Sequence, residues 1–292
     1  MVSSISSSLT RSGFIRSYKS RYHRLLLNRG INDVASTTNA SPDPRFVNLR
    51  NAPHGFDVTS AVVYPRFLTD VEGKSLIKEV GQRMKRRRFE DGHWDSVITG
   101  YREVELPDEQ LSPWQSIVTE NNRAVQEAIH KTRRHLESNI HANPSKQRVD
   151  NGSPETVQIQ WLPCHAIDLS AQGELSAHVD SVKFSGDIVA GISLLSDAIM
   201  RLRPSSSDWE SRGQNESISR FDNSHGYVDL YLPMLSLYVL SGMSRYNYTH
   251  ELLPSNTAFE FVETQTNTGM GEKIEVIRGR RLSIIFRDRK RD

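Results

Sequence analysis

The sequence predicts an α+β protein that is mainly β, with two helices followed by an antiparallel sandwich or barrel. In the body of the chain, apolar residues recur with helical spacing between residues 68 and 136. After Pro154 the pattern changes to short runs rich in Val, Ile, Leu and Tyr, separated by Gly, Ser, Asp and Pro. Such runs are typical of an antiparallel sandwich or barrel.

Two helices are expected before the β-rich part, one over residues 68–84 and one through residues 114–136. In each, the apolar side chains recur every three or four residues and would share one face. These side chains are Val71, Leu76, Ile77, Val80 and Met84 in the first helix, and Trp114, Ile117, Val118, Val125, Ile129 and Leu136 in the second.

Six strands are expected in the β-rich part. The sequence contains no internal repeat, and a single catalytic domain is favoured. The expected strands are residues 157–161, 188–195, 198–202, 227–231, 236–240 and 282–286. The polar segments 203–226 and 263–271 are longer than ordinary connections, and we expect surface loops or insertions there.

Residues 1–30 have the composition of a mitochondrial targeting presequence. They contain six of the 37 basic residues and none of the 35 acidic ones, so the rest of the chain has a formal charge of −4. Serines are frequent, and apolar side chains would form a stripe opposite the arginines on a helix. A basic tail or a nucleic-acid-binding arm is the alternative. Residues 31–45 are expected to be a linker, and residues 46–292 the folded domain in the mitochondrial matrix.

The composition excludes several classes of protein. The longest apolar run, near residues 230–240, is interrupted by Pro233 and Ser236, so no membrane-spanning helix is expected. Cys164 is the only cysteine, which rules out an internal disulfide and is compatible with a reducing compartment. We expect Cys164 to be a small buried side chain, with a catalytic thiol as the alternative.

The run over residues 174–184 contains a His-x-Asp pair, His178 and Asp180. In an extended strand, residues i and i+2 project to the same face about 6.6 Å apart, so both side chains can bind one metal ion. A second histidine would complete the facial triad that suits non-haem Fe(II) oxygenases. Such a pair also arises by chance on protein surfaces, so it is weak evidence by itself.

The second histidine must come from a distant part of the chain, and His250 is the favoured candidate. It directly follows a strand-like run that ends at a turn containing Gly242. His141, His165 and His225 are the competing candidates.

Near the C-terminus, residues 281–287 alternate in a way that indicates a strand with two different faces. Arg281, Ser283 and Arg287 would share one face, with the apolar residues Leu282, Ile284 and Phe286 on the other. Burying two guanidinium groups is costly without an anion, and a dicarboxylate matches their planar donor geometry. The alternative is an edge strand whose arginines are solvated.

Together, His178-x-Asp180, then His250, then Arg281-x-Ser283-x-x-x-Arg287 resemble the AlkB family of Fe(II)- and 2-oxoglutarate-dependent dioxygenases. The resemblance covers nearly the whole body, from about residue 60 to residue 287, although the segments 203–226 and 263–271 depart from the family pattern. The best-matching stretches are residues 93–103, 178–184, 190–196, 200–202, 236–242 and 278–283.

This resemblance implies a double-stranded β-helix (jelly-roll) core with N-terminal supporting helices. It also implies a monomer in which His178, Asp180 and His250 hold Fe(II), with 2-oxoglutarate and O2 as co-substrates and no catalytic residue beyond the metal centre. The residues that would bind 2-oxoglutarate are Tyr238, Arg281, Leu282, Ser283 and Arg287.

The sequence leaves three functions open: hydroxylation of a matrix protein or metabolite, oxidative demethylation of N-methylated bases in mitochondrial RNA, and a non-catalytic scaffold. The acidic body disfavours a polyanionic substrate. The basic run at residues 83–88 could contact phosphate. A solvated helix end, where cations complement the helix dipole, is the favoured interpretation of that run.

Overall fold

The computed structural model describes most of the body of the protein. Residues 1–40, which include the leader, lie outside the described residues, as do residues 206–225, the whole segment 263–271, Trp94 and Trp114. The described residues are 41–92, 97–109, 111, 122–140, 149–150, 153–154, 159–205, 226–262 and 272–290.

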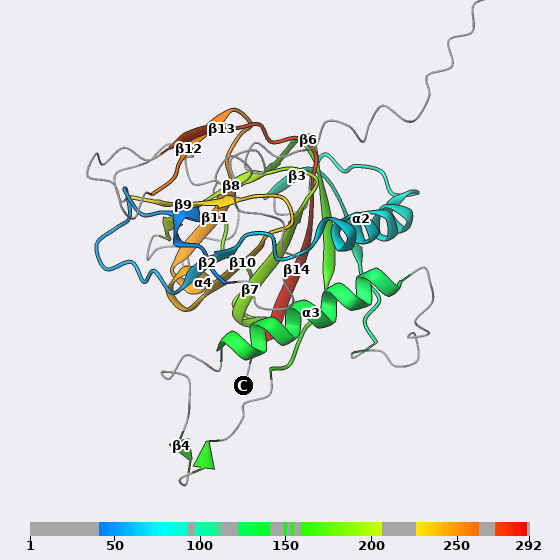
Figure 1. Ribbon diagram of the computed structural model, residues 1–292, viewed down its shortest axis with the longest axis horizontal. Helices are drawn as coiled ribbons and strands as arrows, with labels where there is room; N and C mark the ends of the chain where they lie inside the picture. The colour runs from blue at the N-terminus through cyan, green and yellow to red at the C-terminus, as the bar shows by residue number, and fades with distance from the viewer. Residues whose placement is uncertain are drawn as a thin grey trace, which may run out of the picture. The chain divides into compact units, whose positions relative to one another are not determined.

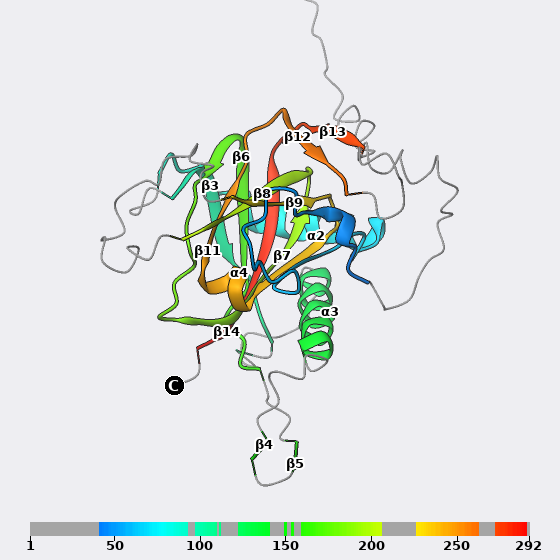
Figure 2. The ribbon, with the colours of Figure 1, turned by 90° about the vertical axis from the view of Figure 1, so that its left-hand side faces the viewer.

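A six-stranded antiparallel sheet, here the large sheet, is the main element of the fold. Its order is β2-β10-β7-β14-β6-β3, and β14 lies between β6 and β7 (Figure 2). The strands are β2 (Ala61–Tyr64), β10 (Leu237–Ser241), β7 (Ser185–Leu194), β14 (Arg281–Arg289), β6 (His165–Leu175) and β3 (Ile98–Glu105).

A second antiparallel sheet, the small sheet, has the order β1-β9-β8-β11. Its strands are β1 (Val47–Asn48), β9 (Val228–Leu232), β8 (Ala198–Pro204) and β11 (Tyr248–Leu252). An isolated antiparallel bridge pairs His178 with His250 of β11, so residue 178 lies beside β11 at the edge of the small sheet.

The chain alternates between the two sheets, which makes the core a double-stranded β-helix, as the family resemblance implied. It runs from β6 in the large sheet to the His178 bridge in the small one, back to β7, through β8 and β9, and then through β10, β11 and β14. Two ribbons lie outside these sheets: β12 (Thr257–Glu260) with β13 (Lys273–Val276), and β4 (Val149–Asp150) with β5 (Ser153–Pro154).

Helix α2 (Asp70–Met84) confirms the first predicted helix. It begins at a capping box in which Thr69 and Glu72 exchange hydrogen bonds. Leu76, Val80 and Met84 are buried, but Val71, which was placed on the same face, is 74% exposed. At about 100° per residue, Val71 lies on the side of the helix opposite Val80, while Gly73 in the same turn is buried. Residues 85–88 after the helix are exposed, which is compatible with a solvated helix end and with contact to phosphate.

Helix α3 (Arg123–Ile140) coincides with part of the second predicted helix; residues 114–121 of that prediction lie outside the described residues. Its first N–H groups are satisfied by α2: the carboxylate of Glu79 accepts from the amides of Ala124 and Val125, both at 3.0 Å. A buried carboxylate at a helix N-terminus is also favoured by the helix dipole.

Both helices pack on the outer face of the large sheet, the face directed away from the small sheet (Figure 1). The core between helices and sheet contains Leu76 and Met84 of α2, Ile129 of α3, and Leu282 and Ile284 of β14. This packing confirms the prediction of supporting N-terminal helices.

The structure tests two further predictions, the positions of the strands and the burial of Cys164. Five strands of the two sheets were not predicted: β1, β2, β3, β6 and β11. In β3, β6 and β11, polar residues obscure the apolar alternation, whereas β1 and β2 are only two and four residues long. Cys164 is buried, and burial raises the pKa of its thiol to about 12, so it is the inert small side chain that was expected.

The start of the fold lies within the end of the expected linker. The amide of Asp43 donates to the carbonyl of Val63 in β2 at 3.0 Å, and a 3-10 helix, Pro44–Phe46, follows. In the part of the chain that the structure describes, no helix is long and apolar enough to cross a membrane.

Candidate metal centre

The structure brings His178, Asp180 and His250 together. One potential ligand atom from each lies within 4.8 Å of the other two. The backbones of His178 and His250 exchange two hydrogen bonds, of 3.2 and 2.8 Å, across the bridge between the connection after β6 and strand β11. Of the competing histidines, His165 hydrogen-bonds Glu103, and His141 and His225 lie outside the described residues.

A hydrogen bond orients the imidazole of His178. Its Nδ1–H donates to the carbonyl of Ser176 at 2.8 Å, which leaves Nε2 directed toward Asp180, 3.8 Å from Oδ1. Metal-binding histidines usually have such a partner on the second nitrogen, because it fixes the tautomer and the ring orientation.

The electrostatics of the cluster suit a divalent cation. Burial alone would raise the pKa of Asp180, but the guanidinium of Arg287, at 3.2 and 3.3 Å, and the two imidazoles hold that pKa well below its usual range. Burial, reinforced by His178, lowers the pKa of His250 to about 3. An ionised carboxylate beside a neutral imidazole of His250 fits the donor set of a facial Fe(II) site.

Strand β14 directs Arg281 and Arg287 to one face, as its alternation predicted, and Arg287 contacts Asp180 of this cluster. Leu282, Ile284 and Phe286 pack in the core on the outer face, so the odd-numbered residues face the interior of the β-helix. Leu282 therefore approaches the interior only through its backbone.

The guanidinium of Arg281 is the feature that best fits a bound anion. Its side chain is buried, and its Nε and one terminal nitrogen have no hydrogen-bond partner among the described residues. It also interacts with the buried phenol of Tyr238, whose pKa is raised by burial. Buried N–H groups without partners are costly, and a carboxylate would satisfy them.

Two residues that sequence reasoning missed adjoin this arginine. Ser193 lies opposite Ser283 in the β7–β14 register, and its buried hydroxyl has no partner among the described residues. Gly191 lies opposite Tyr238, and a Cβ at Gly191 would come within 2.6 Å of the Tyr238 hydroxyl. The Gly-x-Ser spacing in a strand, which puts both residues on one face, was the available signal.

A third missed residue, Arg245, secures the loop that bears Asp180. Arg245 lies in the short helix α4 (Gly242–Tyr246) and is only 2% exposed. Its guanidinium donates to the carbonyls of Asp180 and Ser181 at 3.0 and 3.2 Å, and to Gly186 at 3.1 Å. It also donates to the Ser185 hydroxyl at 2.6 Å. No sequence motif pointed to this contact, since it joins residues about 60 positions apart.

A Gly191→Ala variant is expected to bind 2-oxoglutarate about 10-fold more weakly, because the added methyl group displaces the Tyr238 ring and disturbs one hydrogen bond. Titration calorimetry on the metal-loaded protein would measure this. Gly81→Ala in α2 is the matched control, since its Cβ would meet nothing within 4 Å. Equal affinity of Gly191→Ala and wild type would show that Tyr238 is not needed in its present position.

Comparison with known proteins identifies the class. The family model described as the 2OG-Fe(II) oxygenase superfamily matches residues 61–287. The chain therefore belongs to this superfamily, and it is a dioxygenase with Fe(II), 2-oxoglutarate and O2 as its cofactor and co-substrates. The catalytic class expected from the motifs is thus confirmed.

The AlkB resemblance is confirmed by two relatives, both alpha-ketoglutarate-dependent dioxygenase alkB homolog 7, mitochondrial, the member that the motifs resemble most. The Bos taurus protein is 32% identical over 228 residues, covering 78% of each chain. The Mus musculus protein is 32% identical over 227 residues, covering 78% of this chain and 77% of its own. Among solved structures, OsALKBH1 aligns with a TM-score of 0.43 at 14% identity, over 78% of this chain and 96% of its own.

Proposed function

We propose that His178, Asp180 and His250 bind Fe(II) in this protein, and that Arg281 and Arg287 bind the carboxylates of 2-oxoglutarate. The observation that best supports this assignment is the buried Arg281 guanidinium, which has two N–H donors without partners among the described residues. Arg287, on the same face of β14, contacts the Asp180 carboxylate and so links this anion site to the metal ligands.

In this proposal the chain binds and orients its cofactors. Tyr238 and Ser283 complete the 2-oxoglutarate site, with the backbone of Leu282 beside it. When bound, Fe(II), 2-oxoglutarate and O2 supply the oxidising chemistry, in which decarboxylation to succinate and CO2 is coupled to hydroxylation of a substrate C–H bond. The planar guanidinium groups match the geometry of a dicarboxylate, and the two-residue repeat of β14 directs both inward.

Arg281→Ala and Arg287→Ala are each expected to weaken 2-oxoglutarate binding about 30-fold, the effect of losing roughly 2 kcal/mol of charge-assisted hydrogen bonding. The anaerobic charge-transfer band of the Fe(II)–2-oxoglutarate complex would report the titration. Arg289→Ala is the matched control, because Arg289 belongs to the same strand but is exposed. Wild-type affinity in Arg287→Ala would refute the role given to that residue.

The proposed primary substrate is a protein or a small metabolite. The chain after the leader has a formal charge of −4, and an acidic body attracts polyanions poorly. The exposed basic residues 85–88 favour a second candidate, oxidative demethylation of N-methylated bases in RNA. Protein, metabolite and RNA fractions of mitochondrial extract should be assayed separately for stimulated 2-oxoglutarate turnover. If only the RNA fraction stimulates turnover, RNA demethylation becomes the favoured function.

The proposed location is the mitochondrial matrix, with residues 1–30 as presequence, 31–45 as linker and 46–292 as catalytic domain. The basic, serine-rich composition of the leader and the mitochondrial relatives support this. A fluorescent reporter fused to residues 1–45 is expected to enter mitochondria. A reporter with the five arginines and the one lysine of residues 1–30 changed to glutamine should remain outside, and import of that control would contradict the assignment.

A further inference from the structure

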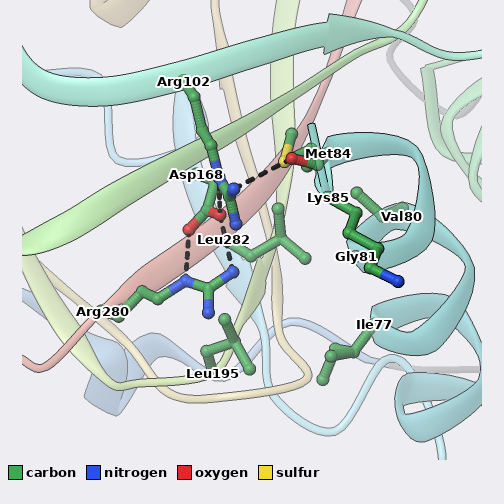
Figure 3. Close-up of a pocket in the computed structure, with 10 residues that line it drawn as sticks. All are labelled: Ile77, Val80, Gly81, Met84, Lys85, Arg102, Asp168, Leu195, Arg280 and Leu282. Carbon is green, nitrogen blue, oxygen red and sulfur yellow. Dashed lines mark hydrogen bonds and ion pairs between the residues drawn. The ribbon is translucent and has the colours of Figure 1, made fainter. Parts of the chain in front are cut away.

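A cavity of about 400 Å³ lies on the outer face of the large sheet, beside the last two turns of α2 (Figure 3). Because Arg281 and Ser283 point to the inner face of β14, this cavity is separated from the candidate metal centre by the strand itself. Its lining residues are Ile77, Val80, Gly81, Met84, Lys85, Arg102, Asp168, Leu195, Arg280 and Leu282.

One part of the cavity is apolar. Ile77, Val80 and Met84 of α2 face Leu282 of β14 and Leu195 across it (Figure 3). The helix leaves space here, since a Cβ added at the lining residue Gly81 would meet nothing within 4 Å. This part of the cavity could hold a short hydrocarbon chain.

The other part is polar and built around a fully buried carboxylate. Arg280 donates to both oxygens of Asp168 at 2.7 Å, and Arg102 donates to one of them at 2.8 Å (Figure 3). Arg102 is fixed further by the carbonyls of Met84 and Arg87, at 2.9 and 3.0 Å. Both guanidinium groups are therefore held in position before any ligand arrives, which lowers the entropy cost of binding.

The charge of this polar part favours an anion. The lining contains three cations, Arg102, Arg280 and Lys85, and one carboxylate, Asp168, so its formal charge is +2. The Arg280 side chain lines the cavity and is 47% exposed. The volume lies in the range of about 300–1,000 Å³ typical of small-molecule sites.

We propose that this cavity is a second ligand site, outside the catalytic pocket, for a small amphipathic anion: a short alkyl chain that ends in a carboxylate or a phosphate. The acidic group would lie against Arg280 and Lys85, and the chain between α2 and Leu282. The planar guanidinium of Arg280 suits either oxyanion. This site does not depend on the iron or on 2-oxoglutarate.

Titration calorimetry on the full-length protein, with hexanoate and hexyl phosphate as probes, tests the proposal without measuring activity. We expect at least one probe to bind with a Kd below about 1 mM, and the stronger one identifies the preferred acidic group. Hexylammonium should not bind, because it places a cation beside cations. Failure of both anionic probes, or equal binding of hexylammonium, would overturn the proposal.

Two variants and a matched control test the location. Gly81→Leu should abolish binding, because the new side chain fills space that is open in the structure, and it replaces a helix glycine by a better helix former. Arg280→Gln should weaken binding about 10-fold, while Asp168 keeps Arg102 as its partner. Arg83→Gln removes an exposed cation from the same helix outside the cavity and should change nothing. If Gly81→Leu binds the probes as tightly as the wild type does, the ligand binds outside this cavity.

Discussion

An Asp180→Ala variant is expected to bind Fe(II) more than about 100-fold more weakly than the wild-type protein. Loss of an outer partner of a metal ligand already costs roughly 10–100-fold in affinity, and Asp180 is the only proposed ligand with a negative charge. The two remaining imidazoles would also lie close to Arg287 without the carboxylate that now neutralises it. Anaerobic Fe(II) titration, with and without 2-oxoglutarate, measures the loss directly.

Two controls make this result specific. Asp180→Asn keeps the size of the side chain but removes its charge, so it should also bind iron poorly. Asp187→Ala removes an exposed carboxylate near the start of β7, seven residues further along the chain, and should bind iron like the wild type. If folded wild-type protein gave no charge-transfer band with Fe(II) and 2-oxoglutarate, the protein would be the non-catalytic scaffold and not an oxygenase.

The features that the sequence predicted best depend on short, regular spacing. Arg281, Ser283 and Arg287 were assigned to one face because side chains alternate in a strand, and the packing of Leu282 and Ile284 in the core confirms that assignment. The same rule placed His178 near Asp180. In both cases the geometry is set by neighbours in the chain, and no tertiary contact is needed to infer it.

The features that the sequence did not predict depend on contacts between distant segments. Gly191 is required because the Tyr238 ring, from a different strand, occupies the space above it. Strand β6 was missed because residues such as Asp168 are charged yet fully buried, with their arginine partners supplied by β3 and by the segment before β14. A charged residue in a sequence ordinarily indicates exposure, and only the tertiary structure shows these pairs.

Arg245→Met is expected to destabilise the protein by about 3 kcal/mol and, in the protein that stays folded, to weaken Fe(II) binding about 10-fold. The buried guanidinium satisfies the carbonyls of Asp180, Ser181 and Gly186, and methionine can satisfy none of them. Each carbonyl would then be left unpaired or would move toward water, and the loop would move with it. Thermal unfolding should show a Tm lower by roughly 10 °C.

The two effects of this substitution can be separated. Arg245→Lys keeps the charge and can reach fewer of the acceptors, so both the stability and the iron affinity should lie between those of Arg245→Met and wild type. Iron affinity is measured well below the Tm, so that unfolding does not contribute to the loss. If Arg245→Met lowers the Tm but binds Fe(II) as tightly as wild type, then Arg245 stabilises the fold without positioning Asp180. If Arg245→Met lowers both the Tm and the Fe(II) affinity, then the Arg245 guanidinium stabilises the loop and also positions the Asp180 carboxylate.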